Sequence, residues 1–141
     1  MPSIFTRIIQ GEIPGRILWT DEVCFAMLDI RPLHEGHVLV IPLTEVDQWT
    51  DLDTATAEHL MSVAHHIGQA QKNVISCKRI GLMIAGFEVP HTHVHVVPMS
   101  SMRDLDFANA DPSVRADVLD GVAAKLRDEL RTLGHGQQVD G

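Results

Sequence analysis

The distribution of apolar residues along the chain predicts a series of short β-strands. The clearest strand covers His37–Ile41, where β-branched and aliphatic residues lie between a glycine and a proline. Two apolar runs on either side of residues 21–22 indicate a hairpin, and residues 4–9 are typical of a short helical turn or coil. The same criteria predict strands over 17–20, 23–28, 80–84 and 91–97.

Two other segments repeat their apolar residues every three or four positions, which is the period of an amphipathic helix. The first covers about 53–75. The second covers about 113–133, where Asp111 and Pro112 resemble a helix start and Gly134 a helix end. Strands joined by hairpins favour antiparallel pairing. We therefore expect an α+β fold with an antiparallel sheet of about five strands, a central helix and an extra C-terminal helix.

Length and charge narrow the class of protein. A chain of 141 residues fits one domain, and its formal net charge of −8 is concentrated between Asp21 and Glu58. Nucleic acid is not an expected partner, because phosphate backbones are held mainly by lysine and arginine. No apolar run approaches the roughly 20 residues of a membrane span, and no signal peptide is recognisable. We therefore expect a cytoplasmic protein that binds neither nucleic acid nor membranes, and whose two cysteines are buried thiols.

Candidate chemistry is concentrated in the segment His91-Thr92-His93-Val94-His95. On a β-strand, side chains two positions apart point to the same face, so the three imidazoles are expected in one row. A pair of them could bind zinc, although the outer two would lie about 14 Å apart at roughly 3.4 Å per residue. No cysteine pair is present to complete such a site.

Two further interpretations of this row concern neutral imidazoles. The histidines could be structural, but buried imidazoles need hydrogen-bond partners and an apolar residue would pack at lower cost. They could instead act in covalent catalysis, with one imidazole attacking phosphorus while its neighbours donate to phosphate oxygens. We favour this third interpretation, because the chain lacks the glycine-rich loop and carboxylate cluster of metal-dependent phosphoryl transfer.

The segment His91–Pro98 resembles the signature of the histidine triad family, in which three alternating histidines precede two apolar residues. The similarity covers roughly residues 3–98. Its other landmarks are Ile4–Ile9, Gly11–Pro14, Leu28–Pro32 and Gly36–Pro42. From it we expect a histidine triad domain over 1–110, a C-terminal helical extension over 111–134 and a flexible tail over 135–141.

The resemblance implies a hydrolase or transferase that acts, without a cofactor, on purine nucleoside monophosphates conjugated through a phosphoramidate or phosphoanhydride bond. By the family pattern, His93 would attack the α-phosphorus and form a nucleotidyl-histidine intermediate. His95 would donate to the phosphate or the leaving group, His91 would support the row, and His37 would orient His93 or relay protons. The family also implies a homodimer. The alternative is a purine-nucleotide-binding module with little or no turnover.

The resemblance also implies a nucleotide-binding surface. Asp29 matches the family's ribose-binding aspartate, since a carboxylate can accept from two vicinal hydroxyls, but it could equally stabilise a turn. Gly86 would allow the backbone to approach the phosphate closely. The apolar walls of the base pocket would be residues that could also be plain core, namely Phe5, Ile8, Met27 and Ile30.

Two departures from the family pattern change the expected chemistry. Ser3, Thr6 and Glu45 stand where zinc-bearing members have two cysteines and a histidine, so we expect no structural zinc. The segment before His91 is shortened, and Glu88 occupies a place where a serine hydroxyl is common. Its carboxylate would repel a phosphate unless it points away, is protonated or meets a cationic part of the substrate.

Overall fold

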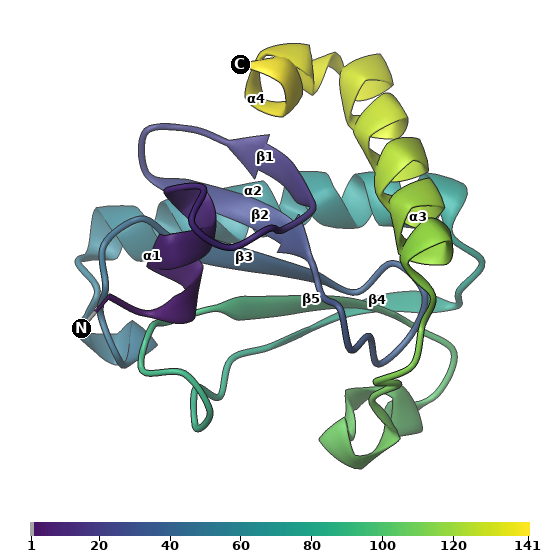
Figure 1. The fold of residues 1–141 in the computed structure, drawn as a ribbon, viewed down its shortest axis with the longest axis horizontal. Coiled ribbons are helices and arrows are strands. Elements are labelled where there is room, and N and C mark those ends of the chain that lie inside the picture. Colours follow the sequence, from purple (N-terminus) through teal and green to yellow (C-terminus); the bar gives the residue numbers. More distant parts are fainter. Residues whose placement is uncertain (1) are drawn as a thin grey trace.

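The computed structural model describes residues 2–141, and its centre is a five-stranded antiparallel sheet (Figure 1). Every pair of neighbouring strands is antiparallel, which confirms the predicted α+β fold. In spatial order the strands are β1 (Ile17–Thr20), β2 (Cys24–Leu28), β3 (Val38–Pro42), β5 (Val94–Met99) and β4 (Arg79–Met83).

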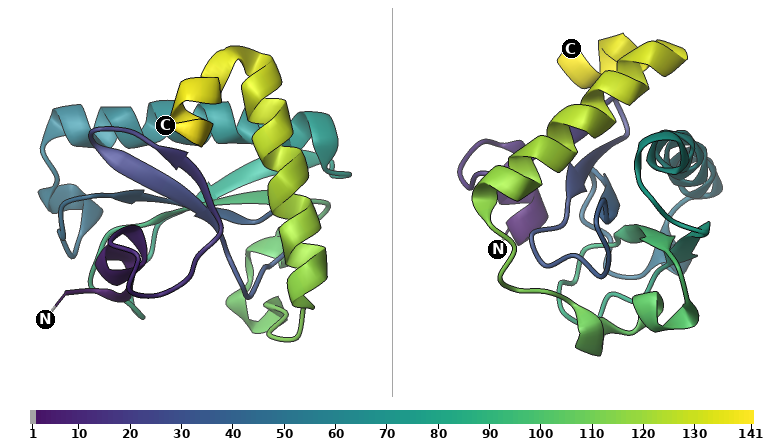
Figure 2. Two further views of the ribbon diagram at one scale, coloured as in Figure 1. Left: turned by 45° about the horizontal axis from the view of Figure 1, so that its top comes forward. Right: turned by 90° about the vertical axis from the view of Figure 1, so that its right-hand side faces the viewer.

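Helices lie on both faces of this sheet. The long helix α2 (Thr54–Val74) covers one face and the short helix α1 (Ile4–Ile9) the other (Figures 1 and 2). Helix α3 (Ala116–Leu130) packs against α2, and α4 (Gly136–Asp140) returns over β1. Within residues 2–141, no helix is long and apolar enough to cross a membrane. Short 3-10 helices cover Trp49–Asp51, Met102–Leu105 and Phe107–Asn109, and a π-helical segment covers Arg131–His135.

Alternation along the strands divides the buried residues into two cores. Ala26 and Val40 point toward α2 and join its apolar face, whereas Met27 and Leu39 point toward α1. In the register of β3 and β5, His95 lies opposite Leu39. The sheet thus places His95 on the face covered by α1.

Strand β5 differs from the strand predicted over 91–97. It begins at Val94, so His91 and His93 precede it and the expectation of three histidines on one strand face is wrong. The chain at Thr92 pairs instead with the loop after β3, because its backbone N–H and its hydroxyl both donate to the Val46 carbonyl.

The other end of β5 also differs, because the strand continues through Pro98 to Met99. Its pairing with β3 stops at Val96, and beyond that residue β5 pairs with β4 alone. The missing N–H of Pro98 therefore falls where one side of the strand has no partner, which is where proline is tolerated.

The C-terminal segment is more ordered than the sequence suggests. Helix α3 begins at Ala116 with Arg115 as its N-cap, not at Asp111-Pro112, and the chain turns at Gly134 with a φ of 98°. The following residues, for which a loose tail is predicted, form α4. So short a helix is not stable alone, and it is supported here by contact with β1 and by packing of Val139 against the core.

Candidate active site

His93 presents one free ring nitrogen. Its Nδ1 lies 2.7 Å from the backbone oxygen of His91. A carbonyl oxygen only accepts hydrogen bonds, so in the neutral ring Nδ1 carries the proton and Nε2 holds the lone pair. The ring is buried and meets Phe5 edge-on at a centroid distance of 4.9 Å. This packing and the hydrogen bond together fix the tautomer and the orientation of the imidazole.

A second hydrogen-bond chain fixes the tautomers of His37 and His95. The backbone N–H of Leu33 donates to Nδ1 of His37, so the proton of a neutral His37 is on Nε2. That Nε2 lies 2.9 Å from Nδ1 of His95, which must therefore accept and keep its own proton on Nε2. The His95 ring also contacts His93, with centroids 5.0 Å apart.

Burial keeps this pair neutral. It lowers the pKa of His37 to about 4 and that of His95 to about 3, and the charge of the neighbouring histidines adds to the effect. Near pH 7 both rings are uncharged, so the arrangement offers a neutral N–H donor at Nε2 of His95 beside the lone pair at Nε2 of His93.

His91 holds two elements together and does not share the cavity that His93 and His95 line. Its Nε2–H donates to the Pro42 carbonyl at 2.7 Å, and its Nδ1 accepts from the Ser3 hydroxyl at 2.6 Å. Ser3 also caps α1 by accepting the Thr6 N–H. This fully buried imidazole thus joins the start of α1 to the end of β3.

Ser3, Thr6 and Glu45 lie together, as expected from their correspondence to the zinc ligands of the histidine triad proteins that the sequence resembles. The Glu45 carboxylate accepts from the Ser3 N–H and from the Thr6 hydroxyl. These hydrogen bonds lower the pKa of Glu45. A carboxylate and two hydroxyl side chains therefore connect the start of α1 to the loop after β3.

Asp29 fills the structural one of the two roles that the sequence leaves open, and it also lies beside the histidine pair. Its Oδ1 accepts the Arg31 N–H at 2.8 Å and stabilises the turn after β2. Its Oδ2 lies 3.6 Å from Nε2 of His37. Burial raises the pKa of Asp29, although the Arg31 N–H and guanidinium oppose the shift. One carboxylate oxygen thus remains free to accept further hydrogen bonds beside the histidine pair.

The expected apolar wall is partly assembled. Phe5, Ile8 and Met27 are buried in one cluster between α1 and the sheet, and Phe5 contacts both His91 and His93. Ile30 is 56% exposed and lies outside this cluster.

A small cavity of about 80 Å³ opens beside His93 and His95. Gly86 lines it with a φ of 86°, in the left-handed region that favours glycine. Phe107 closes another side and meets the His95 ring at a centroid distance of 5.0 Å. No local sequence signal marks Phe107, because it lies on a three-residue 3-10 helix without apolar periodicity. The cavity also includes Glu88.

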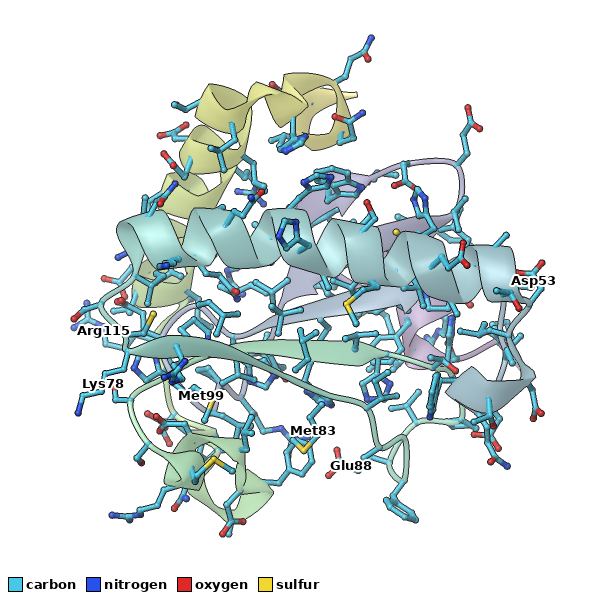
Figure 3. All side chains as sticks on the ribbon, turned by 180° about the vertical axis from the view of Figure 1, so that it is seen from behind. Asp53, Lys78, Met83, Glu88, Met99 and Arg115 are labelled. Carbon is cyan, nitrogen blue, oxygen red and sulfur yellow. The ribbon has the colours of Figure 1, made fainter. Side chains whose placement is uncertain are left out.

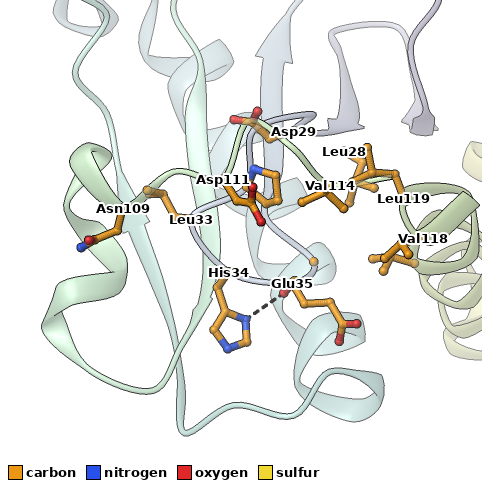
Figure 4. Close-up of a pocket in the computed structure, with 13 residues that line it drawn as sticks. Leu28, Asp29, Leu33, His34, Glu35, Asn109, Asp111, Val114, Val118 and Leu119 are labelled. Atoms are coloured by element: carbon orange, nitrogen blue, oxygen red, sulfur yellow. Dashed lines mark hydrogen bonds between the residues drawn. The ribbon is translucent and has the colours of Figure 1, made fainter. Parts of the chain in front are cut away.

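A larger cavity of about 310 Å³ lies between the segment 28–36 and the start of α3 (Figure 4). Its walls include Leu28, Val114 and Leu119, and none of the four histidines described above lines it. Asp29 contributes to its edge, but Figure 4 shows the carboxylate turned away from the other labelled side chains. The candidate active site is therefore the smaller, histidine-lined cavity.

Two groups of potential metal ligands are already linked by hydrogen bonds. Asp29, His37 and His95 offer ligand atoms within 4.8 Å of one another, but Nε2 of His37 and Nδ1 of His95 are bonded to each other. In the second group, the Asp21 carboxylate accepts from His59 at 2.7 Å. That group comprises Asp21, Cys24 and His59. In each group, two of these residues already share a proton in a hydrogen bond, which a metal would have to displace.

Comparison with known proteins identifies a family and several relatives that the chain is similar to. Residues 10–102 match the HIT domain family. The chain is 33% identical over 96 residues to the adenosine 5′-monophosphoramidase HNT1 of Saccharomyces cerevisiae, covering 67% of this chain and 61% of that protein. It is 28% identical over 128 residues to the adenylylsulfatase HINT3 of Arabidopsis thaliana, covering 87% and 64%.

The fold comparison agrees with the sequence comparison. A crystal structure of a Hit-like protein from Bartonella henselae, described as involved in cell-cycle regulation, superposes with a TM-score of 0.79 at 26% identity. The match covers 90% of this chain and 95% of that one. The chain therefore belongs to the histidine triad (HIT) family, as the His91–Pro98 segment predicts.

Proposed function

We propose that this protein acts on purine nucleoside 5′-monophosphate conjugates through a covalent nucleotidyl-histidine intermediate on His93. The observation that carries the proposal is the hydrogen bond from Nδ1 of His93 to a backbone carbonyl, which leaves the Nε2 lone pair free. Attack would form the Nε2–phosphorus bond and break the bond to the leaving group, which departs with the electron pair. Water would then add to phosphorus, release the nucleoside monophosphate and restore the lone pair.

His95 and His37 would assist this reaction without a cofactor. The Nε2–H of His95 would donate to a phosphoryl oxygen or to the leaving atom, and His37 would hold His95 in that tautomer. An amine leaving group takes up one proton in the first step, and hydrolysis of the intermediate releases one. The proton count therefore balances over the cycle.

The nucleoside would lie on the α1 side of the histidines. The free oxygen of Asp29 would accept from the ribose hydroxyls, and Phe5, Ile8 and Met27 would form the apolar wall for the base. Gly86 would bring its backbone close to the phosphate, and Ile30 would cover the open side of the base.

The names of two relatives support the substrate class. One is an adenosine 5′-monophosphoramidase and the other an adenylylsulfatase, so both names describe the cleavage of an adenylyl conjugate. The two substrates differ in the bond between the nucleotide and the leaving group. This bond is a P–N bond in the phosphoramidate and a mixed anhydride in the adenylyl sulfate. A phosphoramidate or phosphoanhydride of a purine nucleoside monophosphate is therefore the proposed substrate.

Adenosine 5′-phosphoramidate tests the proposal. We expect the protein to release AMP, and His93→Ala to lose activity by a factor of about 1,000 or more, as for other covalent catalysts. His34→Ala is the matched control, because that ring lies outside the histidine cavity and bonds only the neighbouring Glu35 carbonyl. Undiminished turnover by His93→Ala contradicts the mechanism. Tight AMP binding in calorimetry with no turnover supports the alternative, a nucleotide-binding module.

The surroundings of β4 support a homodimer as part of the proposal. This strand is at the edge of the sheet, and a groove of about 500 Å³ separates it from α2. Met61 and Leu82 in the groove are exposed, so pairing of two β4 strands would cover apolar surface and extend the sheet. We also propose a cytoplasmic location, because the two free cysteines are compatible with a reducing compartment. Light scattering should give twice the chain mass of 15.6 kDa, and the mass of a single chain contradicts the dimer.

A further inference from the structure

Glu88 lies at the opening of the histidine cavity without a partner. Together with Gly86, His93 and His95 it lines the cavity of about 80 Å³. Figure 3 shows its side chain on the same side of the loop as Met83, the residue paired with His95 in the sheet. Glu88 is exposed, and it forms no hydrogen bond or ion pair with any other residue in the range 2–141. Its charge is therefore available to a ligand.

Two aromatic rings accompany this carboxylate. Phe87 is 98% exposed and Phe107 is 42% exposed, and both line the same cavity. Of the lysines and arginines in residues 2–141, none lines it. Aromatic faces attract ammonium groups, and a carboxylate adds a direct charge interaction. Two exposed aromatic rings beside an unpaired carboxylate are typical of a site that binds an organic cation.

The position of these groups relative to His93 identifies the part of the substrate that they would contact. Phe5 and the apolar wall approach His93 from the α1 side, whereas the cavity residues of 85–88 and Phe107 approach the His93–His95 pair from another side. If the nucleoside lies on the α1 side and the phosphate lies at His93, the third part of the substrate, on the other side of phosphorus, lies beside Glu88. That group is the leaving group.

From this placement, and on the basis of the proposed function, we infer that Glu88 makes the enzyme selective for leaving groups that carry a positive charge. The preferred substrate class is a nucleoside monophosphate joined through a P–N bond to an amine with a second, cationic ammonium group. Glu88 takes no part in breaking the bond: the P–N electron pair departs with nitrogen, which gains one proton, while the distal ammonium stays beside the carboxylate. Anionic leaving groups, such as sulfate, are disfavoured by the same charge.

Three substrates of equal length test this inference. AMP is joined through nitrogen to alkyl chains that end in an ammonium, a methyl or a carboxylate group, and kcat/KM is measured for each. Because the carboxylate is exposed, we expect the wild type to prefer the cationic over the anionic substrate by roughly three- to tenfold. The preference should decrease as salt is added.

Two substitutions change the charge without changing the fold of an exposed loop. Glu88→Gln should bring the cationic-to-anionic ratio close to one, and Glu88→Lys should reverse it. Glu22→Gln is the matched control: it removes the same charge from the exposed β1–β2 turn, which lines none of the histidine cavity, and should keep the wild-type ratio. The ratio of the cationic to the neutral substrate should fall in Glu88→Gln and further in Glu88→Lys, and it should stay at the wild-type value in Glu22→Gln.

Different experimental results would contradict the role of Glu88 and the proposed function. Turnover of all three substrates with a ratio unchanged by Glu88→Gln overturns the role of Glu88 and leaves the function intact. Absence of turnover overturns the function, and selectivity is then measured by calorimetric binding of the same compounds to His93→Ala and to His93→Ala/Glu88→Gln. Equal affinity for cationic and anionic compounds in both variants overturns the inference there as well.

Discussion

At the scale of single residues, one backbone donor determines the proton positions on two imidazoles. The Leu33 N–H occupies Nδ1 of His37, which places the His37 proton on Nε2. That proton in turn occupies Nδ1 of His95, and the His95 proton must then be on Nε2. Neither ring needs a charge for this, which agrees with the lowered pKa of each. The direction of the hydrogen bonds thus makes His95 a donor.

Replacement of His37 tests this assignment. His37→Gln retains an N–H that can donate toward Nδ1 of His95, whereas His37→Leu removes the donor and leaves that nitrogen unpaired in a buried site. We expect kcat to fall about tenfold or more further in the Leu variant than in the Gln variant. Nitrogen chemical shifts of His95 should report the Nε2–H tautomer in the wild type. Equal kcat in the two variants, or an Nδ1–H tautomer of His95, contradicts the assignment.

The sequence predicts that several histidines lie close together, but it does not predict their hydrogen-bond partners. His37, His93 and His95 lie close together, but the hydrogen bond of His37 goes to His95 and not to His93, the partner that the family resemblance implies. The hydrogen-bond partners of these three histidines and of His91 include backbone groups and distant side chains. One example is the Ser3 hydroxyl, which lies 88 positions from its partner His91 in the sequence. Such contacts depend on tertiary structure and have no local pattern. Alternation predicts a side chain's face only where a strand exists, and His91 and His93 precede β5.

At the scale of secondary-structure elements, prediction succeeds where apolar periodicity is long. Helix α2 lies within one residue of the predicted span at each end, because its apolar face and the Asp53 N-cap are both local signals. The C-terminal helices are less predictable. Residues 136–140 are mostly polar, and their helix depends on contact with β1 and on the Arg131–Asp140 ion pair.

Gly134 and Gly121 provide a matched test of the turn that positions α4. Gly134 adopts a φ of 98°, so Gly134→Ala should lower the free energy of unfolding by about 1 kcal/mol despite open space around the site. Gly121 is exposed within α3 and also has open space, so Gly121→Ala should raise the free energy of unfolding by about 0.5–1 kcal/mol. Urea denaturation followed by tryptophan fluorescence measures both. Stabilisation by Gly134→Ala would show that the turn is not constrained as described.

At the scale of the whole molecule, the α1 face of the sheet contains an unusual amount of buried polar surface. His37, His91, His93 and His95 are nearly inaccessible to solvent. Apart from Nε2 of His93 and Nε2 of His95, their ring nitrogens bond to one another or to backbone and hydroxyl groups. Neutral imidazoles can be buried with such partners, but protonated ones cannot be buried at the same cost. The fold is therefore coupled to pH through groups that also form the candidate active site.

The sign of this coupling follows from the pKa of two rings. In the unfolded chain a histidine has a pKa near 6.5, whereas in the folded protein the pKa is about 4 for His37 and about 3 for His95. Well above pH 6.5 both states are neutral and the rings add no pH dependence. Below it the unfolded chain takes up protons that the folded protein does not, so the free energy of unfolding falls as the pH falls. The lowered pKa of His91 acts in the same direction.

Between pH 6.5 and pH 5.5 the two rings together should lower the free energy of unfolding by about 2 kcal/mol, because each gives up to about 1.4 kcal/mol per pH unit once the unfolded ring is protonated. Asp21, with a pKa lowered to about 2, contributes stability that is lost only below about pH 4, outside this interval. Urea denaturation at pH 7.5, 6.5 and 5.5 measures the effect, and most of the loss should occur over the lower interval. His37→Gln removes one of the two rings and should remove about half of that loss. Stability that is constant from pH 6.5 to 5.5 would mean that these imidazoles accept protons in the folded state, and the neutral donor assigned to His95 would then be wrong.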